Sequence, residues 1–371
     1  MLVHGRQWDG LPTGLYAAGY RQVWRVCSDG YCTRVWEKIM PRIDDSILNC
    51  GIYLYSSEEE AKRGEPYGGS GFLVGVPFRS RPPNTAWHCY AVTNAHVVKG
   101  GYPVVRVNTN HPHPEMKTMA IPLTQDDWIC HQAGDDLALA SIDLDTYLHR
   151  FVLISPDSGS HEFFMSKQIQ QDTALGAGDE VFMIGRFMAR DESIHNAPIA
   201  RFGHIASSQV EAIQQGEGGF RQESFLVEVH SISGSSGSPV FVNIPVYRIK
   251  EEAKQRDGDH PLVTVVRGVA RQLQHRTFLL GVDWGHLDEH NFPGMAGVVP
   301  AWKLLALLNC DRVLEMQNEE ETRSAKQKKR GAKLDLRDKS QLSNAGIEIP
   351  IPSKREVMDI FKKATRKRDK K

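Results

Sequence analysis

The sequence predicts an all-β fold, a barrel or a sandwich, because short apolar runs bounded by turn residues recur at fairly even spacing. These runs include WHCYAVT, PVVRVN, DEVFMIG, PVFVNI and FLLGVDWG. The chain also holds 32 glycines and 19 prolines, which suit frequent turns. Only two segments predict helices, residues 301–309 after Pro300 and residues 355–367. Strands therefore do not alternate with helices, which argues against a parallel sheet.

The elements follow one another in a simple order. Residues 1–45 form an N-terminal extension, in which QVWRV and TRVWE flank an Asp29-Gly30 turn and predict two short strands. SILNCGIYLY, residues 46–55, predicts a strand, and the charged residues 56–67 predict a loop. Strands then continue to about residue 300. Residues 311–352 have mixed charge and predict a flexible linker.

Composition excludes several classes of protein. With 40% hydrophobic and 24% charged residues, global disorder is excluded. No run of about 18 apolar residues occurs, so we expect no transmembrane segment. The net charge is zero, with 45 basic and 45 acidic side chains. This balance conceals an asymmetry, because residues 321–371 carry a net charge of +10 and the rest of the chain −10.

The N-terminus and the cysteines suggest a reducing compartment. MLVHGRQWDGLPTG lacks the apolar stretch of a secretory signal. The six cysteines are scattered, with no C-x2-C pair, so we expect no zinc site and no cofactor. His111 and His113 alternate with prolines, which favours a solvated loop over a metal site. We expect reduced cysteines and a cytoplasmic protein.

Three polar segments contain residue types that suit nucleophilic catalysis. Thr93-Asn94-Ala95-His96 ends an apolar strand, Asp135-Asp136 precedes the strand Leu137-Ala138-Leu139, and Gly234-Ser235-Ser236-Gly237-Ser238-Pro239 precedes another strand. A serine hydroxyl needs an adjacent base at neutral pH, and histidine can supply one. A buried carboxylate orients that histidine. Glycines around the serine allow backbone N–H groups to face a developing oxyanion.

The chain resembles the trypsin/chymotrypsin-fold serine proteases, in particular bacterial trypsin-like peptidases. The resemblance rests on the three segments above, on Gly69-Ser70-Gly71-Phe72 and on Gly178-Asp179-Glu180-Val181. It implies two packed antiparallel β-barrels, with a C-terminal helix and a basic tail outside the motifs. We expect a peptidase domain over residues 46–312, with the first barrel over about 46–150 and the second over about 165–300, and linker and tail over 313–371.

The resemblance also implies a site and an activity. Ser236 matches the nucleophile, His96 the general base, and Asp136 the orienting carboxylate, with Asp135 as a rival. The N–H groups of Gly234 and Ser236 match the oxyanion hole. The implied activity is that of a serine endopeptidase acting on proteins or peptides through an acyl-enzyme. The alternative is a protease-fold binding or regulatory module with little turnover.

The expected specificity pocket has seven candidate residues. These are His230, Ser231, Ser233, Asp283, Trp284, Gly285 and Gly294. No acidic residue falls clearly at the pocket base, so a preference for Lys or Arg does not follow. Ser235 stands where digestive-type zymogens have an aspartate, so activation through an ion pair with a new N-terminus is not expected. The charged residues 248–259 form an insertion, and their composition favours a solvated excursion over a lid.

The tail is the last element. Ser353 and Glu356 fit a capping box that opens a helix. Val357, Ile360, Phe361 and Ala364 share one face of it, surrounded by basic residues. Such a helix can dock on a protein partner, the acidic body, an anionic membrane or a nucleic acid, or it can simply keep the chain soluble.

Overall fold

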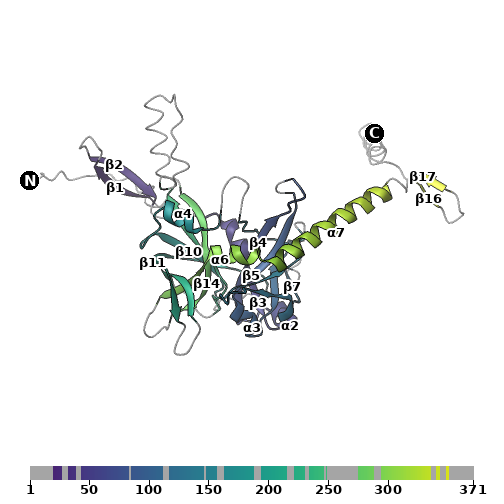
Figure 1. The fold of residues 1–371 in the computed structure, drawn as a ribbon, viewed down its shortest axis with the longest axis horizontal. Coiled ribbons are helices and arrows are strands. Elements are labelled where there is room, and N and C mark those ends of the chain that lie inside the picture. Colours follow the sequence, from purple (N-terminus) through teal and green to yellow (C-terminus); the bar gives the residue numbers. More distant parts are fainter. Residues whose placement is uncertain are drawn as a thin grey trace, which may run out of the picture. The chain divides into compact units, whose positions relative to one another are not determined.

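Two antiparallel sheets form most of the first of two units in the computed structural model, Met1–Cys310 and Asp311–Lys371. The structure describes residues 20–26, 32–38, 43–82, 85–111, 117–145, 148–156, 163–187, 194–214, 221–229, 234–245, 248, 275–287, 294–335, 340–342 and 348–350. Figure 1 shows the two sheets as neighbouring bodies within the first unit. The prediction of an all-β fold built on two antiparallel barrels is confirmed in the two antiparallel sheets, of which one closes into a barrel.

The first sheet has seven strands in the hydrogen-bonded order β7-β6-β3-β4-β5-β9-β8. Its strands are β3 (Gly51–Tyr55), β4 (Gly69–Pro77), β5 (Trp87–Thr93), β6 (Val104–Asn108), β7 (Thr118–Ile121), β8 (Ile129–Cys130) and β9 (Ala138–Ser141). All its ladders are antiparallel. A separate hairpin, β1 (Tyr20–Val26) and β2 (Cys32–Lys38), confirms the two strands expected in the N-terminal extension.

The second sheet closes into a six-stranded barrel of order β10-β11-β12-β15-β14-β13. Its strands are β10 (Glu180–Gly185), β11 (Ile199–Gln214), β12 (Arg221–Glu228), β13 (Pro239–Pro245), β14 (His275–His286) and β15 (Met295–Pro300). Closure leaves no exposed sheet edge. Phe182 and Phe241 stack in this barrel with ring centroids 5.0 Å apart.

Short helices join the strands of the first unit. They are α2 (Glu58–Arg63), α3 (Ala95–Lys99), α4 (Lys167–Asp172) and α6 (Ala301–Leu308). The helix expected over residues 301–309 is confirmed as α6, which buries Leu304, Leu307 and Leu308. Helix α3 lies so close to β4 that a Cβ atom on Gly69 would approach Val97 Cγ1 to 2.4 Å. Glycine at this position therefore allows α3 its place beside the strand.

The sequence reading was wrong for two segments near the start of the first sheet. Residues 45–50 form a 3-10 helix capped by Asp44, so the strand expected over 46–55 begins only at Gly51. Residues 58–63 form α2 rather than a loop. Ser57 caps this helix by accepting from Glu60 N, and Gly64 ends it in the left-handed conformation with φ 68°.

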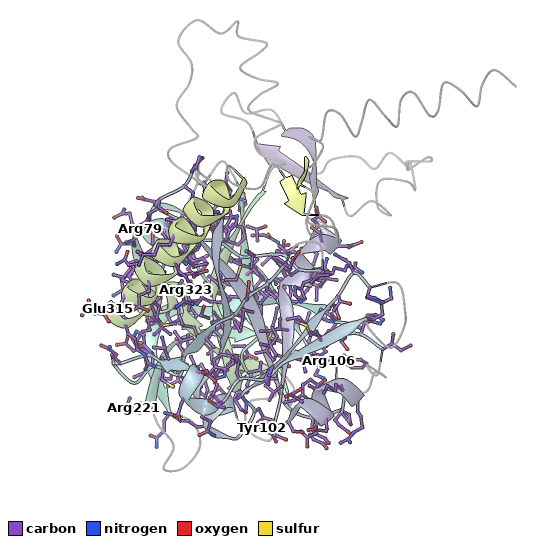
Figure 2. All side chains as sticks on the ribbon, turned by 90° about the vertical axis from the view of Figure 1, so that its right-hand side faces the viewer. Arg79, Tyr102, Arg106, Arg221, Glu315 and Arg323 are labelled. Carbon is purple, nitrogen blue, oxygen red and sulfur yellow. The ribbon has the colours of Figure 1, made fainter. Side chains whose placement is uncertain are left out.

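The flexible linker expected over residues 311–352 is also wrong for its first half. Helix α7 (Asp311–Asp335) occupies it, followed by the strands β16 (Ser340–Leu342) and β17 (Glu348–Pro350), which pair with each other. Glu315 and Arg323 are exposed on α7 and labelled in Figure 2. Glu, Lys, Arg, Gln and Ala are strong helix formers, and the acidic start and basic end of this segment suit the helix dipole.

Some expectations fall outside the described residues. These include the tail helix over 355–367 and most of the insertion over 248–259. In the part of the chain that the structure does describe, no helix combines the length and the apolar character needed to cross a bilayer.

Candidate active site

Strand pairing places His96 and Asp136 at one end of the first sheet. Strands β5 and β9 are antiparallel, with Thr93 opposite Ala138. The residues that follow β5 therefore lie beside the residues that precede β9. His96 lies in α3, directly after β5, and Asp136 lies two residues before β9.

His96 and Asp136 are in direct contact. His96 Nδ1 lies 2.5 Å from Asp136 Oδ2, and the His96 backbone N–H donates to Asp136 Oδ1 at 2.8 Å. The Asp136 side chain is 3% exposed and that of His96 39%. Asn94 fixes the same segment by donating from Nδ2 to Asp136 O at 2.8 Å. A buried carboxylate thus faces one ring nitrogen of a partly exposed imidazole, which is the arrangement that an orienting acid and a general base need.

Asp135 has different partners, although it neighbours Asp136 in the sequence. Asp135 Oδ1 accepts from Lys303 Nζ at 2.6 Å and from Gln222 Nε2 at 2.8 Å. Asp135 Oδ2 lies 3.1 Å from His131 Nδ1. The contacts therefore favour Asp136, the residue chosen from the sequence, over its rival as the partner of His96.

The Ser236 segment is a tight glycine-containing turn ahead of β13. Gly234 has φ 84° and Gly237 φ 91°, a region that residues with a Cβ atom rarely adopt. Ser235 and Ser238 are fully buried, whereas Ser236 is partly exposed. Ser238 N donates to Ser235 O at 2.9 Å, which closes the turn around Ser236.

Backbone contacts hold this turn against the first sheet. Ser70 on β4 donates from its backbone N to Ser236 O at 3.0 Å and from Oγ to Gly234 O at 2.6 Å. Ser70 O in turn accepts from Thr93 Oγ1 at 2.7 Å. Ser70 thus links the Ser236 turn to β5, the strand that leads into His96. Sequence analysis placed Ser70 in a motif but did not find this role.

Gly237 lies in the middle of these contacts. A Cβ atom on Gly237 would come within 2.1 Å of Ser70 O and 2.3 Å of Thr93 Oγ1. Its backbone N donates to Asp283 O at 2.8 Å. Both the left-handed conformation and the close approach therefore require glycine here.

The backbone N–H groups of the Ser236 turn differ in whether they have acceptors. The N–H groups of Gly237 and Ser238 are used within the protein, as given above. Those of Gly234 and Ser236 have no hydrogen-bond acceptor among the residues that the structure describes. In the described part of the chain, Ser236 Oγ and His96 Nε2 likewise share no hydrogen bond; such bonds often tighten only when substrate binds.

Arg201 contacts Ser235, the residue directly before Ser236. Arg201 on β11 donates from Nη1 to Ser235 Oγ at 3.3 Å and from Nη2 to Arg186 O at 3.0 Å. Burial lowers the pKa of Arg201, and the charge of Asp283 partly opposes this effect. The Ser235 hydroxyl, which is neutral, is thus held by a guanidinium from the closed barrel.

The expected pocket residues are only partly described. Asp283 and Trp284 are fully buried. Asp283 Oδ1 accepts from Gly285 N at 3.1 Å, and Trp284 Nε1 donates to Ser224 Oγ at 2.7 Å. Gly285 and Gly294 have φ 138° and 83°. His230, Ser231 and Ser233 lie outside the described residues, so the pocket stays a prediction.

Among the residues that the structure describes, the other reactive groups do not gather into a second centre. Over the described ranges, no group of three or more His, Cys, Asp or Glu side chains could hold a metal ion. Cys50, Cys89, Cys130 and Cys310 are not joined in disulfides. Burial raises the pKa of the Cys50 thiol, which suits a structural cysteine rather than a nucleophile.

Comparison with known proteins identifies part of the chain. Residues 69–243 match the family model described as trypsin-like peptidase domain, a range that includes His96, Asp136 and Ser236. No curated protein matches. Among the solved structures that match is the inactive form of a serine-to-alanine mutant of Rv3671c from M. tuberculosis H37Rv, with 13% sequence identity and a TM-score of 0.34. That match covers 71% of this chain and 87% of the other.

Proposed function

We propose that this chain, which carries a trypsin-like peptidase domain, is a serine endopeptidase that uses Ser236, His96 and Asp136 as its catalytic residues. The single observation that carries the proposal is the contact of the buried Asp136 carboxylate with His96 Nδ1 at 2.5 Å. A second contact supports the proposal. Hydrogen bonds of Ser70 connect the Ser236 turn to β5, the strand that leads into His96.

The proposed reaction is acyl transfer to Ser236. The Ser236 oxygen attacks the peptide carbonyl carbon while His96 Nε2 takes the hydroxyl proton. The tetrahedral intermediate then collapses, the C–N bond breaks, and His96 returns the proton to the leaving amine. A water molecule attacks the resulting ester with the help of the same base. This second step releases the carboxylic acid and restores Ser236.

The other groups support charge that develops in this reaction. Asp136 holds the proton on His96 Nδ1, so that Nε2 can accept, and it stabilises the imidazolium that forms. The N–H groups of Gly234 and Ser236 are the proposed donors to the oxyanion. Each such donor lowers the barrier by about 2.7–4 kcal/mol.

A fluorophosphonate probe tests the proposal, because it reacts covalently with an activated serine. We expect labelling of the folded wild-type protein at Ser236 and no labelling of Ser236→Ala. Ser238→Ala is the matched control, since Ser238 lies two residues away in the same turn but is fully buried. It should label like the wild type. If folded wild-type protein fails to label and cleaves no member of a peptide library, the chain is a binding module instead.

A further inference from the structure

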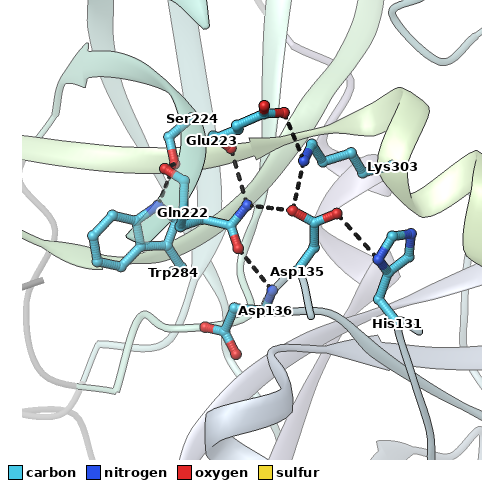
Figure 3. A network of polar contacts seen from close by, with 8 residues as sticks. All are labelled: His131, Asp135, Asp136, Gln222, Glu223, Ser224, Trp284 and Lys303. Atoms are coloured by element: carbon cyan, nitrogen blue, oxygen red, sulfur yellow. Dashed lines mark hydrogen bonds and ion pairs between the residues drawn. The ribbon is translucent and has the colours of Figure 1, made fainter. Parts of the chain in front are cut away.

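A buried glutamine of the closed barrel reaches across to the segment that carries Asp136. Gln222 on β12 is 1% exposed. Its Oε1 accepts from Asp136 N at 2.8 Å, and its Nε2 donates to Asp135 Oδ1 at 2.8 Å and to Glu223 O at 3.0 Å, as Figure 3 shows. A flipped amide would point N–H groups at the Asp136 N–H, so these partners fix its orientation.

An ion pair anchors the donor side of this glutamine. Lys303 on α6 lies 2.6 Å from Asp135 Oδ1 and 2.9 Å from Glu223 Oε2 (Figure 3). Burial lowers the pKa of Lys303, but its hydrogen bonds to Asp135 and Glu223 outweigh burial and raise the pKa above its ordinary value. Lys303 therefore stays charged at neutral pH, and Asp135 remains a fixed acceptor for Gln222.

Gln222 completes a set of contacts that surround Asp136 on every polar side. The Asp136 backbone N–H donates to Gln222, its carbonyl accepts from Asn94, and its carboxylate contacts His96 through both oxygens. Asn94 and His96 follow a strand of the first sheet, as Asp136 precedes one, but Gln222 comes from the closed barrel. The position of the carboxylate thus depends on how the first sheet and the closed barrel are joined.

We propose that Gln222, anchored by the Asp135–Lys303 pair, is a positioning residue that sets the Asp136 carboxylate against His96. The inference rests on the proposed function and adds to it the means by which the closed barrel controls the base. It assigns Asp135 the task of orienting a glutamine, and it links α6 to the reaction centre through Asp135 and Gln222.

The sharpest test replaces Gln222 with a side chain of the same shape that titrates. In Gln222→Glu, the protonated carboxyl can still accept from Asp136 N and donate to Asp135. Once ionised, it places a negative charge against Asp135 and the Glu223 carbonyl. These neighbours and the Glu223 carboxylate favour its protonated form, while Lys303 opposes them.

The expected signature is a change in the shape of the pH profile. For the wild type, the fluorophosphonate labelling rate should rise with pH and then stay level. For Gln222→Glu, the rate should rise and then fall by about 10- to 100-fold as the introduced carboxyl ionises and misplaces Asp136. His131 also faces Asp135, and it is present in the wild type and in the variant alike. The wild-type profile is therefore the reference with which the Gln222→Glu profile is compared.

A second variant and a matched control separate positioning from general stability. Gln222→Met should lower the labelling rate by about 10- to 100-fold at every pH. Gln170→Met is the control. The Gln170 side chain likewise donates from Nε2, to Ser208 O at 2.8 Å, but this hydrogen bond does not involve the Asp135–Asp136 segment. It should keep the wild-type rate and profile. If Gln222→Met does not fold, the profile of Gln222→Glu alone decides.

The inference is overturned if both Gln222 variants label at the wild-type rate with the wild-type pH profile, whatever their melting temperatures. Failure of the proposed function gives a different result, since the wild-type protein itself would then not label.

Discussion

The two halves of the candidate site are held in place by different kinds of contact. His96 and Asp136 come from the first sheet and are fixed mainly by side-chain hydrogen bonds, with Asp136 almost fully buried. The Ser236 turn precedes a strand of the closed barrel and is fixed by backbone atoms, with glycines in the left-handed region on both sides of Ser236.

This difference determines which substitutions each half tolerates. The His96–Asp136 pair depends on the identity of its polar atoms, so an isosteric exchange of one atom should disrupt it. The Ser236 turn depends on the path of its backbone, so one added methyl group should displace it. Ser70 and Gln222 join the halves, because each bonds a segment of the opposite sheet.

The largest effect is expected from Asp136→Asn. The exchange keeps the shape but puts an amide where His96 Nδ1 needs an acceptor, which favours the wrong tautomer of the imidazole. We expect kcat/KM for peptide hydrolysis to fall by about 10,000-fold, with little change in melting temperature.

The neighbouring carboxylate provides the matched control. Asp135→Asn removes one of the two carboxylate partners of Lys303 but leaves the Asp136–His96 contact, so kcat/KM should fall by no more than about 100-fold. A greater loss for Asp135→Asn than for Asp136→Asn would reverse the assignment of the two aspartates.

A smaller effect is expected from Gly237→Ala, which tests the Ser236 turn. The added Cβ would meet Ser70 O at 2.1 Å, so the turn must move and carry Ser236 with it. We expect a loss of about 100-fold in the labelling rate. Gly101→Ala is the control, since Gly101 has nearly the same φ, 92°, but nothing within 4 Å of the added atom. It should cost about 1–2 kcal/mol of stability and leave labelling unchanged.

Much of this arrangement is predictable from local sequence, and the rest is not. His96, Asp136 and the Ser236 turn lie in short motifs at strand ends, where spacing and residue type are informative. Gln222 and Lys303 have no such motif, because their partners lie 86 and 168 residues away. Only the folded sheets bring these residues together.

The errors in the fold have physical reasons as well. The sequence runs that predicted strands did not include β11, because most of its 16 residues are exposed or half-buried and few are large and apolar. Helix α2 carried a readable signal, Ser57 three residues before Glu60, which is a capping pattern. For α7, high charge was interpreted as disorder, although the same residues favour a helix.

The smallest expected effect is on the pH dependence of stability, through His131 beside Asp135. Burial lowers the pKa of His131, and the charge of Lys303 lowers it further against the opposing charge of Asp135. Between its lowered folded pKa and about 6.5, the unfolded chain binds more protons than the folded one. The free energy of unfolding therefore falls as pH falls through this interval.

His131→Asn removes this titration, so the loss of stability between pH 7 and pH 5 should become smaller than in the wild type. Chemical denaturation at the two pH values measures it. His204→Asn, at an exposed position on β11, should keep the wild-type pH dependence. An unchanged dependence in His131→Asn would mean that His131 is protonated as easily in the folded protein as in the unfolded chain. The network around Asp135 would then be open to water. The polar contacts around Asp136 would differ less from the Ser236 turn, which backbone hydrogen bonds hold.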